Sequence, residues 1–95
     1  MITHIVLFKL ADPKPESLES TAEVLRSMEG NIPELQSIDV GIDALKTERS
    51  FDIALVTRHA DWDAYQAYQI HPVHQGVLVH MRSVVERSVA VDYEG

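Results

Sequence analysis

The feature that most constrains the fold is a pair of strand-like segments that are apolar on both faces. Residues 2–10 read ITHIVLFKL, and residues 51–59 read FDIALVTRH. Side chains of a strand alternate between the two faces of a sheet, and here aliphatic residues occupy odd and even positions alike. An antiparallel sheet with a solvated face shows polar residues on that face. A sheet built from these two strands therefore needs cover on both sides.

The other segments predict two more strands and a first helix within a single domain, residues 1–95. After the breaker ADPKP, apolar residues at helical spacing predict an amphipathic helix from about residue 15 to residue 29, with Gly30 at its C′ position. Residues 37–42 alternate between apolar and polar and predict a strand, and a polar loop over 43–50 follows. The same alternation over 85–93 predicts the last strand.

The stretch YQIHPVHQG interrupts a helical region. Asp61 is a suitable N-cap for a helix over 62–70, which ends there because the residue before a proline leaves the α region. Pro72 then serves as the first residue of another helix, which continues over 73–84. The predicted order is β-α-β-β-α-β, which is the ferredoxin-like α+β arrangement with an antiparallel sheet.

The two-sided strands also predict the partner. Helices on one face of the sheet leave the other face open, and a second copy of the same sheet is the simplest cover by two-fold symmetry. We therefore expect a homodimer. The alternative is that loops cover the far face of short central strands.

Composition excludes several other partners. The net charge is −7, and the eight Lys and Arg residues are scattered, so no basic face is present for nucleic acid or for an anionic membrane. No cysteine is present, which removes disulfides, thiolate nucleophiles and Cys-based metal centres. The opening residues predict a strand and not a signal peptide. We expect a cytoplasmic protein whose partners are small molecules or proteins.

Four segments resemble the stress-responsive A/B barrel (Dabb) family: MITHIVLFKL, IPELQSIDVG, YQIHPVHQGV and the closing VAVDYE. The resemblance covers nearly the whole chain, and HPVHQ is one of its most specific parts. It implies a homodimer in which two ferredoxin-like sheets pack into one α+β barrel. Function varies in this family: many members are small dimeric proteins linked to stress, and some plant members resemble polyketide cyclases. A related superfamily includes monooxygenases and haem-degrading enzymes.

The resemblance to the cyclases implies a site without metal or cofactor. It makes Tyr68 and His74 the catalytic pair and places His4 in the pocket, while Ile53 stands where the cyclases have another pocket histidine. We expect Phe8 to line the same pocket. A neutral imidazole can take a proton from a carbon beside a carbonyl, and a phenol can donate a hydrogen bond to the enolate oxygen that forms.

Three alternatives stay open. Tyr68 can be a core aromatic residue, with His74 bonded only to backbone and His71 serving as a structural residue at the joint. A metal site would need His71 and His74 with help from His4 or His59. Residues three apart lie on the same face only when both belong to one helix, and His71 precedes the helix that contains His74. The chain can accordingly be a small-molecule binding protein, a cofactor-free cyclase or lyase, or a structural stress protein without a ligand.

Overall fold

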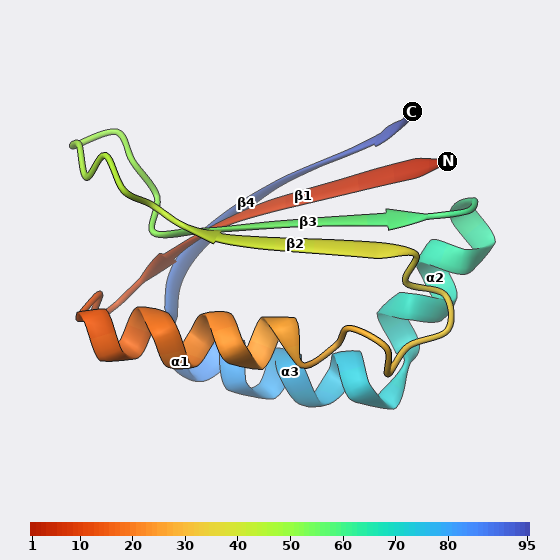
Figure 1. Ribbon diagram of the computed structural model, residues 1–95, viewed down its shortest axis with the longest axis horizontal. Helices are drawn as coiled ribbons and strands as arrows, with labels where there is room; N and C mark the ends of the chain where they lie inside the picture. Colours follow the sequence, from red (N-terminus) through yellow and green to blue (C-terminus); the bar gives the residue numbers. More distant parts are fainter.

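Seven elements make up the protein in a computed structural model that describes all 95 residues (Figure 1). The four strands form one antiparallel sheet in the order β2-β3-β1-β4. The predicted ferredoxin-like α+β fold is confirmed, with two helices in the second crossover where Pro72 breaks the helical region. The elements are β1 (Ile2–Leu10), α1 (Pro15–Arg26), β2 (Ser37–Ile42), β3 (Ile53–His59), α2 (Trp62–Ile70), α3 (Pro72–Val84) and β4 (Val85–Glu94).

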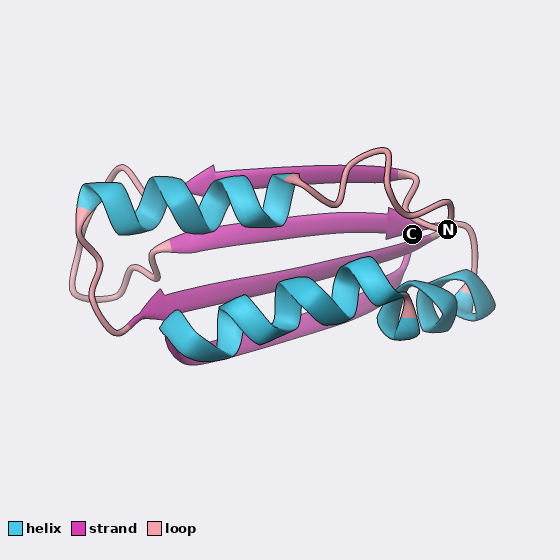
Figure 2. Cartoon of the chain, turned by 90° about the horizontal axis from the view of Figure 1, so that it is seen from below, coloured by secondary structure: helices cyan, strands magenta, loops and turns pink.

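All three helices lie on the same face of the sheet (Figure 1), with α1 and α3 running along the strands and α2 at one end (Figure 2). Helix α1 begins at Pro15, whose missing N–H is no loss in the first turn, and it buries Leu18, Ala22 and Leu25. The helix ends at Arg26, earlier than predicted. Tighter turns follow, in which backbone N–H groups bond to carbonyls three residues back, until Gly30 at φ 77° reverses the chain.

The register of the sheet separates two faces. On β1, the side chains of His4, Val6 and Phe8 face the helices, and Leu55 of β3 lies opposite Val6 on the same side. The core fills the layer between this face and the helices. Its buried members are Leu10, Leu18, Ala22, Leu25, Met28, Ile32, Val40, Ile53, Leu55, Tyr68, Val77 and Met81.

No helix covers the other face of the sheet (Figure 1). Ile5 and Leu7 of β1 lie there, opposite Val56 and Ala54 of β3 and opposite Val91 and Val89 of β4. Val91 is 53% exposed and Val89 is 44% exposed, so large apolar side chains face outward. The sheet is apolar on both faces, as the two-sided strands predicted.

The loop between β2 and β3 rises on this helix-free side (Figure 1). Strand β3 begins at Ile53, two residues later than predicted, because Asp52 has other bonding partners. Its backbone N–H bonds to the carbonyl of Phe8, and its carboxylate accepts the N–H of Leu10 at 2.8 Å. None of the helices has the length and apolar character needed to cross a membrane.

Candidate functional site

Five aromatic rings meet between the sheet and helices α2 and α3. The ring of Tyr68 is central: its centroid lies 4.4 Å from that of His74 and 4.6 Å from that of His59. Tyr65 lies 5.3 Å from His4 and 5.4 Å from His59. Two histidines come from the sheet and the other three residues come from the helices, so the cluster depends on the tertiary fold.

The helix joint determines the position of His74. The side chain of His71 accepts the backbone N–H of Val73 at 3.1 Å, so His71 is the N-cap of α3 as well as the end of α2. Pro72 is the first residue of α3, which makes His74 the third. The predicted position of His74 in the first turn is therefore confirmed, and its side chain is buried.

A backbone carbonyl fixes the tautomer of His74. Nδ1 lies 2.9 Å from the carbonyl oxygen of Gln69, which can only accept, so Nδ1 carries the proton and the lone pair of Nε2 is free. Burial lowers the pKa of His74, and the nearby His4, His59 and His71 act in the same direction, against the hydrogen bond to Gln69. His74 is thus a neutral imidazole near pH 7, with Nε2 as a potential base.

Tyr68 is held as a neutral phenol. It is fully buried, and its hydroxyl donates to the sulfur of Met28, at 3.8 Å, which is a weak acceptor. Burial raises the pKa of Tyr68, the neighbouring Tyr65 raises it further, and the Thr57 hydroxyl opposes this in smaller measure. A phenol that stays protonated near neutral pH and has a weak acceptor can transfer its hydrogen bond to a ligand oxygen.

Strand pairing brings a carboxylate to the same place. His4 and Asp92 are direct partners on β1 and β4, and Nδ1 of His4 bonds to the carboxylate of Asp92. Burial raises the pKa of the Tyr65 phenol, and the negative charge of Asp92 raises it as well. The site therefore contains one carboxylate, paired with an imidazole, beside two neutral phenols.

A cavity of about 300 Å³ opens beside these groups. Its polar side chains come from His4, Tyr65, Tyr68, Gln69, His74, Ser88 and Asp92. The remaining lining residues are apolar: Val6, Phe8, Leu25, Met28, Leu55, Val77, Leu78, Met81 and Ala90.

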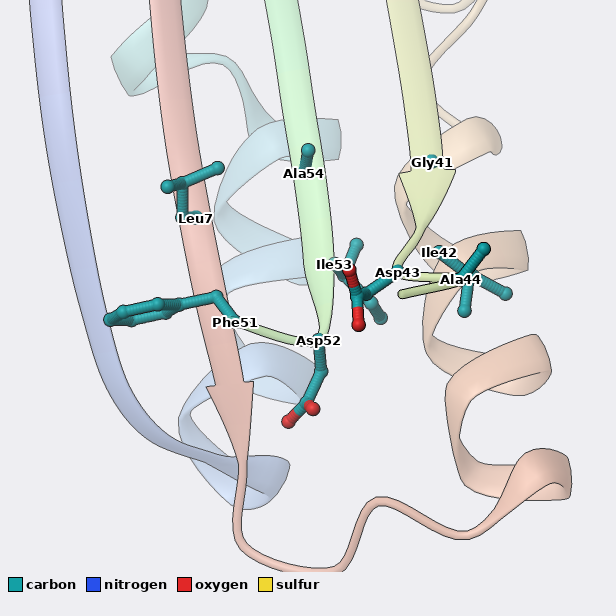
Figure 3. Close-up of a pocket in the computed structure, with 9 residues that line it drawn as sticks. All are labelled: Leu7, Gly41, Ile42, Asp43, Ala44, Phe51, Asp52, Ile53 and Ala54. Carbon is teal, nitrogen blue, oxygen red and sulfur yellow. The ribbon is translucent and has the colours of Figure 1, made fainter. Parts of the chain in front are cut away.

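A second hollow of about 410 Å³ lies on the helix-free face, beside the loop between β2 and β3 (Figure 3). Its walls are Leu7, Ala54, Gly41 and neighbouring side chains, and it contains no imidazole or phenol. Asp52 at its rim already accepts the N–H of Leu10. Although this hollow is larger, the groups suited to acid–base chemistry line the cavity beneath the helices.

The comparisons with known proteins agree with the fold. The sequence matches the Stress responsive A/B Barrel Domain family, Dabb, over residues 2–95. The chain belongs to the Dabb family.

A dimeric ferredoxin-like protein from Thermobifida fusca is 30% identical to this Dabb chain, with a TM-score of 0.88 over 99% of this chain and 90% of that one. A dimeric protein of ferredoxin-like fold from Bacteroides fragilis is 28% identical, with a TM-score of 0.83 over 99% and 95%. The hydroxynitrile lyase from Passiflora edulis has a TM-score of 0.83 at 14% identity, covering 97% and 90%, and this likeness concerns the fold alone. No curated protein matches the sequence.

Four of the five residues singled out from the sequence line one cavity in this Dabb domain: His4, Phe8, Tyr68 and His74. Ile53 does not. Its side chain is 2% exposed and belongs to the core, and the residue borders the hollow on the opposite side of the sheet.

Sequence reasoning missed Asp92, Tyr65 and Gln69 as members of the site, and it considered His59 only as a metal ligand. To predict that Asp92 belongs to the site would have required the register of β4 on β1. His59 is fully buried between the Glu34 carbonyl and the Thr57 hydroxyl, each at 2.9 Å from one ring nitrogen. No three His, Asp or Glu side chains of this Dabb domain are grouped so that they could hold a metal ion.

Proposed function

We propose that this Dabb protein binds a small, mostly apolar carbonyl compound beneath the helices and catalyses proton transfer at the carbon next to the carbonyl. One observation carries the proposal: the free Nε2 of His74 and the hydroxyl of Tyr68 belong to residues that border the same cavity. An apolar cavity with a few convergent polar groups is the usual form of a small-molecule site.

The two side chains have complementary roles in this proposal. Neutral His74 accepts the proton through Nε2, since Nδ1 is held by the Gln69 carbonyl. Tyr68 donates its hydrogen bond to the carbonyl oxygen as negative charge develops there, exchanging the weak contact with Met28 for a stronger one. Return of the proton from His74 to a different carbon of a conjugated enolate completes an isomerisation. In an aldol-type step the enolate carbon bonds to the carbon of a second carbonyl, and the alkoxide that forms takes the proton from His74. A positioned base of this kind contributes about 10²–10⁴-fold in rate.

The alternative is a binding protein without turnover, and the fold does not decide between the two. A lyase from Passiflora edulis shares the fold at 14% identity, which supports no inference about the reaction of this chain. The proposal therefore rests on the cavity and on the bonding of His74.

Deuterium exchange tests it directly. A methyl ketone such as heptan-2-one, incubated with the protein in D₂O, should exchange the protons beside its carbonyl, and NMR follows the rate. His74→Ala should lower the protein-dependent rate by about 100-fold or more. Tyr68→Phe should lower it by roughly 10-fold or more through loss of one donor. His80→Gln is the control, because His80 also lies on α3 but does not line the cavity. Binding of the ketone without exchange would refute catalysis and favour a carrier.

We further propose that the protein works as a homodimer through its helix-free face. Support comes from the exposed valines of β4 on this face and from the two relatives at 28% and 30% identity, which are described as dimeric. Packing of two such sheets would produce the α+β barrel expected from the sequence. Sedimentation equilibrium tests the proposal, and a monomer at micromolar concentration would contradict it.

A further inference from the structure

The side chain of Gln75 bonds to the same carbonyl that fixes the tautomer of His74. Its amide nitrogen Nε2 donates to the Gln69 carbonyl oxygen at 2.6 Å, and Nδ1 of His74 donates to that oxygen at 2.9 Å. A carbonyl oxygen has two lone pairs, so the two donors occupy both of them. Gln75 therefore shares an acceptor with the proposed base, although it does not line the cavity.

This carbonyl lacks the partner that an unbroken helix would give it. Gln69 belongs to the last turn of α2, where helix carbonyls have no N–H group of a following turn to accept. In a continuous helix the N–H of Val73 would be its partner, but the ring of His71 takes that N–H. Two side chains of α3 bond to the carbonyl instead, and the bond from Gln75 is the shorter of the two.

The outer side of this joint is open to water. Gln75 is exposed, and Ile70, which follows Gln69 in the chain, is 77% exposed. Water molecules in place of the amide would be mobile donors, whereas Gln75 is attached to the same first turn of α3 as His74. The amide therefore ties the end of α2 to the start of α3 across the break at Pro72.

The position of the carbonyl decides which nitrogen of His74 is the free base. A neutral imidazole carries one N–H proton, and the hydrogen bond made by one nitrogen sets the role of the other. A neutral histidine without such a bond favours the proton on Nε2, the nitrogen that the proposed reaction needs unprotonated. A carbonyl held close to Nδ1 reverses this preference.

We propose that Gln75 is a positioning residue for the proton transfer: it holds the Gln69 carbonyl against Nδ1 of His74 and so keeps Nε2 free to act as the base. The inference rests on the proposed function for the role of His74. The tautomer itself can be measured without any ligand.

Gln75→Met tests the role of the amide. Methionine is unbranched like glutamine and has a similar helix propensity, but it cannot donate a hydrogen bond. Because Gln75 is exposed, the variant should fold. Gln66→Met is the matched control, since Gln66 is exposed on the neighbouring helix α2 and does not line the cavity.

Two-bond ¹H–¹⁵N correlation spectra of the imidazoles show which ring nitrogen carries the proton. They are recorded at about pH 8, where histidine is neutral, and the signals of His74 are those that His74→Gln removes. In the unchanged protein and in Gln66→Met, the proton of His74 should be on Nδ1. In Gln75→Met a measurable share of the Nε2–H form should appear.

The same variant should exchange the protons of heptan-2-one more slowly. Only the Nδ1–H form has a free Nε2, so the rate should fall in proportion to the share of molecules that keep this form. Loss of one hydrogen bond predicts a decrease of roughly two- to tenfold. The dissociation constant of the ketone should stay the same, because Gln75 does not line the cavity.

A Gln75→Met variant in which His74 keeps its proton entirely on Nδ1 would overturn the positioning role. So would a detectable exchange rate that the substitution leaves unchanged, or an equal change of tautomer in Gln66→Met. Failure of the proposed function is a different result: a changed tautomer in Gln75→Met, with no exchange of ketone protons in the unchanged protein, removes the proton transfer and supports the positioning of His74.

Discussion

Replacing Thr57 by valine should destabilise the protein by about 1–3 kcal/mol, although the two side chains have nearly the same shape. Thr57 and His59 are neighbours on the helix side of β3, and both are fully buried. Nδ1 of His59 lies 2.9 Å from the Glu34 carbonyl, which can only accept, so this nitrogen carries the proton. Nε2 is then an acceptor, and the Thr57 hydroxyl, at 2.9 Å, must be its donor.

The magnitude follows from what valine leaves behind. No other donor reaches Nε2 of His59, so the substitution would leave a buried acceptor unpaired. The cost of removing that acceptor from water would then no longer be offset by a hydrogen bond. Thr57→Ser keeps the hydroxyl and removes only a buried methyl group, which costs about 0.5–1.5 kcal/mol by analogy with Ile→Val. The serine variant should therefore be more stable than the valine variant.

Urea unfolding at a fixed protein concentration measures the difference, because the proposed dimer would make the apparent stability depend on concentration. A loss of 1 kcal/mol should also lower the melting temperature by roughly 4–8 °C in a domain of this size. Adding His59→Phe to Thr57→Val removes both partners of the bond, so the double variant should lose less than the sum of the two single changes. A Thr57→Val variant as stable as the unchanged protein, or additive losses, would refute the assigned hydrogen bond.

Two other predictions concern pH and assembly. Burial lowers the pKa of both His59 and His74, so the unfolded chain binds more protons than the folded one below the ordinary histidine pKa of about 6.5. Stability should therefore fall as the pH drops through about 6.5 toward the folded-state pKa values. Urea midpoints measured over this pH range should fall less in the His74→Gln variant. Val91→Asp should shift the sedimentation equilibrium toward monomer because a carboxylate would lie in the apolar face of the sheet, whereas Val79→Asp, at a similarly exposed site on α3, should leave it unchanged.

The fold could be predicted because its signals are local. Runs of aliphatic residues identified β1 and β3, alternation of apolar and polar residues identified β2 and β4, and helical spacing identified α1. A single proline divided the second crossover. The predicted end of α1 and the predicted start of β3 were less accurate. The first depends on the turns before Gly30, and the second depends on the two hydrogen bonds of Asp52. These are contacts between specific groups, which spacing does not encode.

The site was predictable only in part, for the same reason. Tyr68 and His74 lie within one short stretch, so a motif could identify them. The partnership of His4 with Asp92 joins opposite ends of the chain and requires the register of β4 on β1. Ile53 lies on the helix side of the sheet like its strand partner Phe8, but it is packed in the core while Phe8 borders the cavity. Which residues of one face reach the cavity depends on where the helices sit.

The break at Pro72 is what prepares His74 for its proposed role. In a continuous helix the carbonyl of Gln69 would accept the N–H of Val73, four residues on. Here His71 takes that N–H through its own ring nitrogen, because the residue before a proline is extended and cannot continue the helix. The Gln69 carbonyl is left to accept from Nδ1 of His74, and this bond turns the free lone pair of Nε2 into a base. The two histidines around the proline therefore act in sequence: His71 frees a carbonyl by capping a helix, and that carbonyl sets the tautomer of His74.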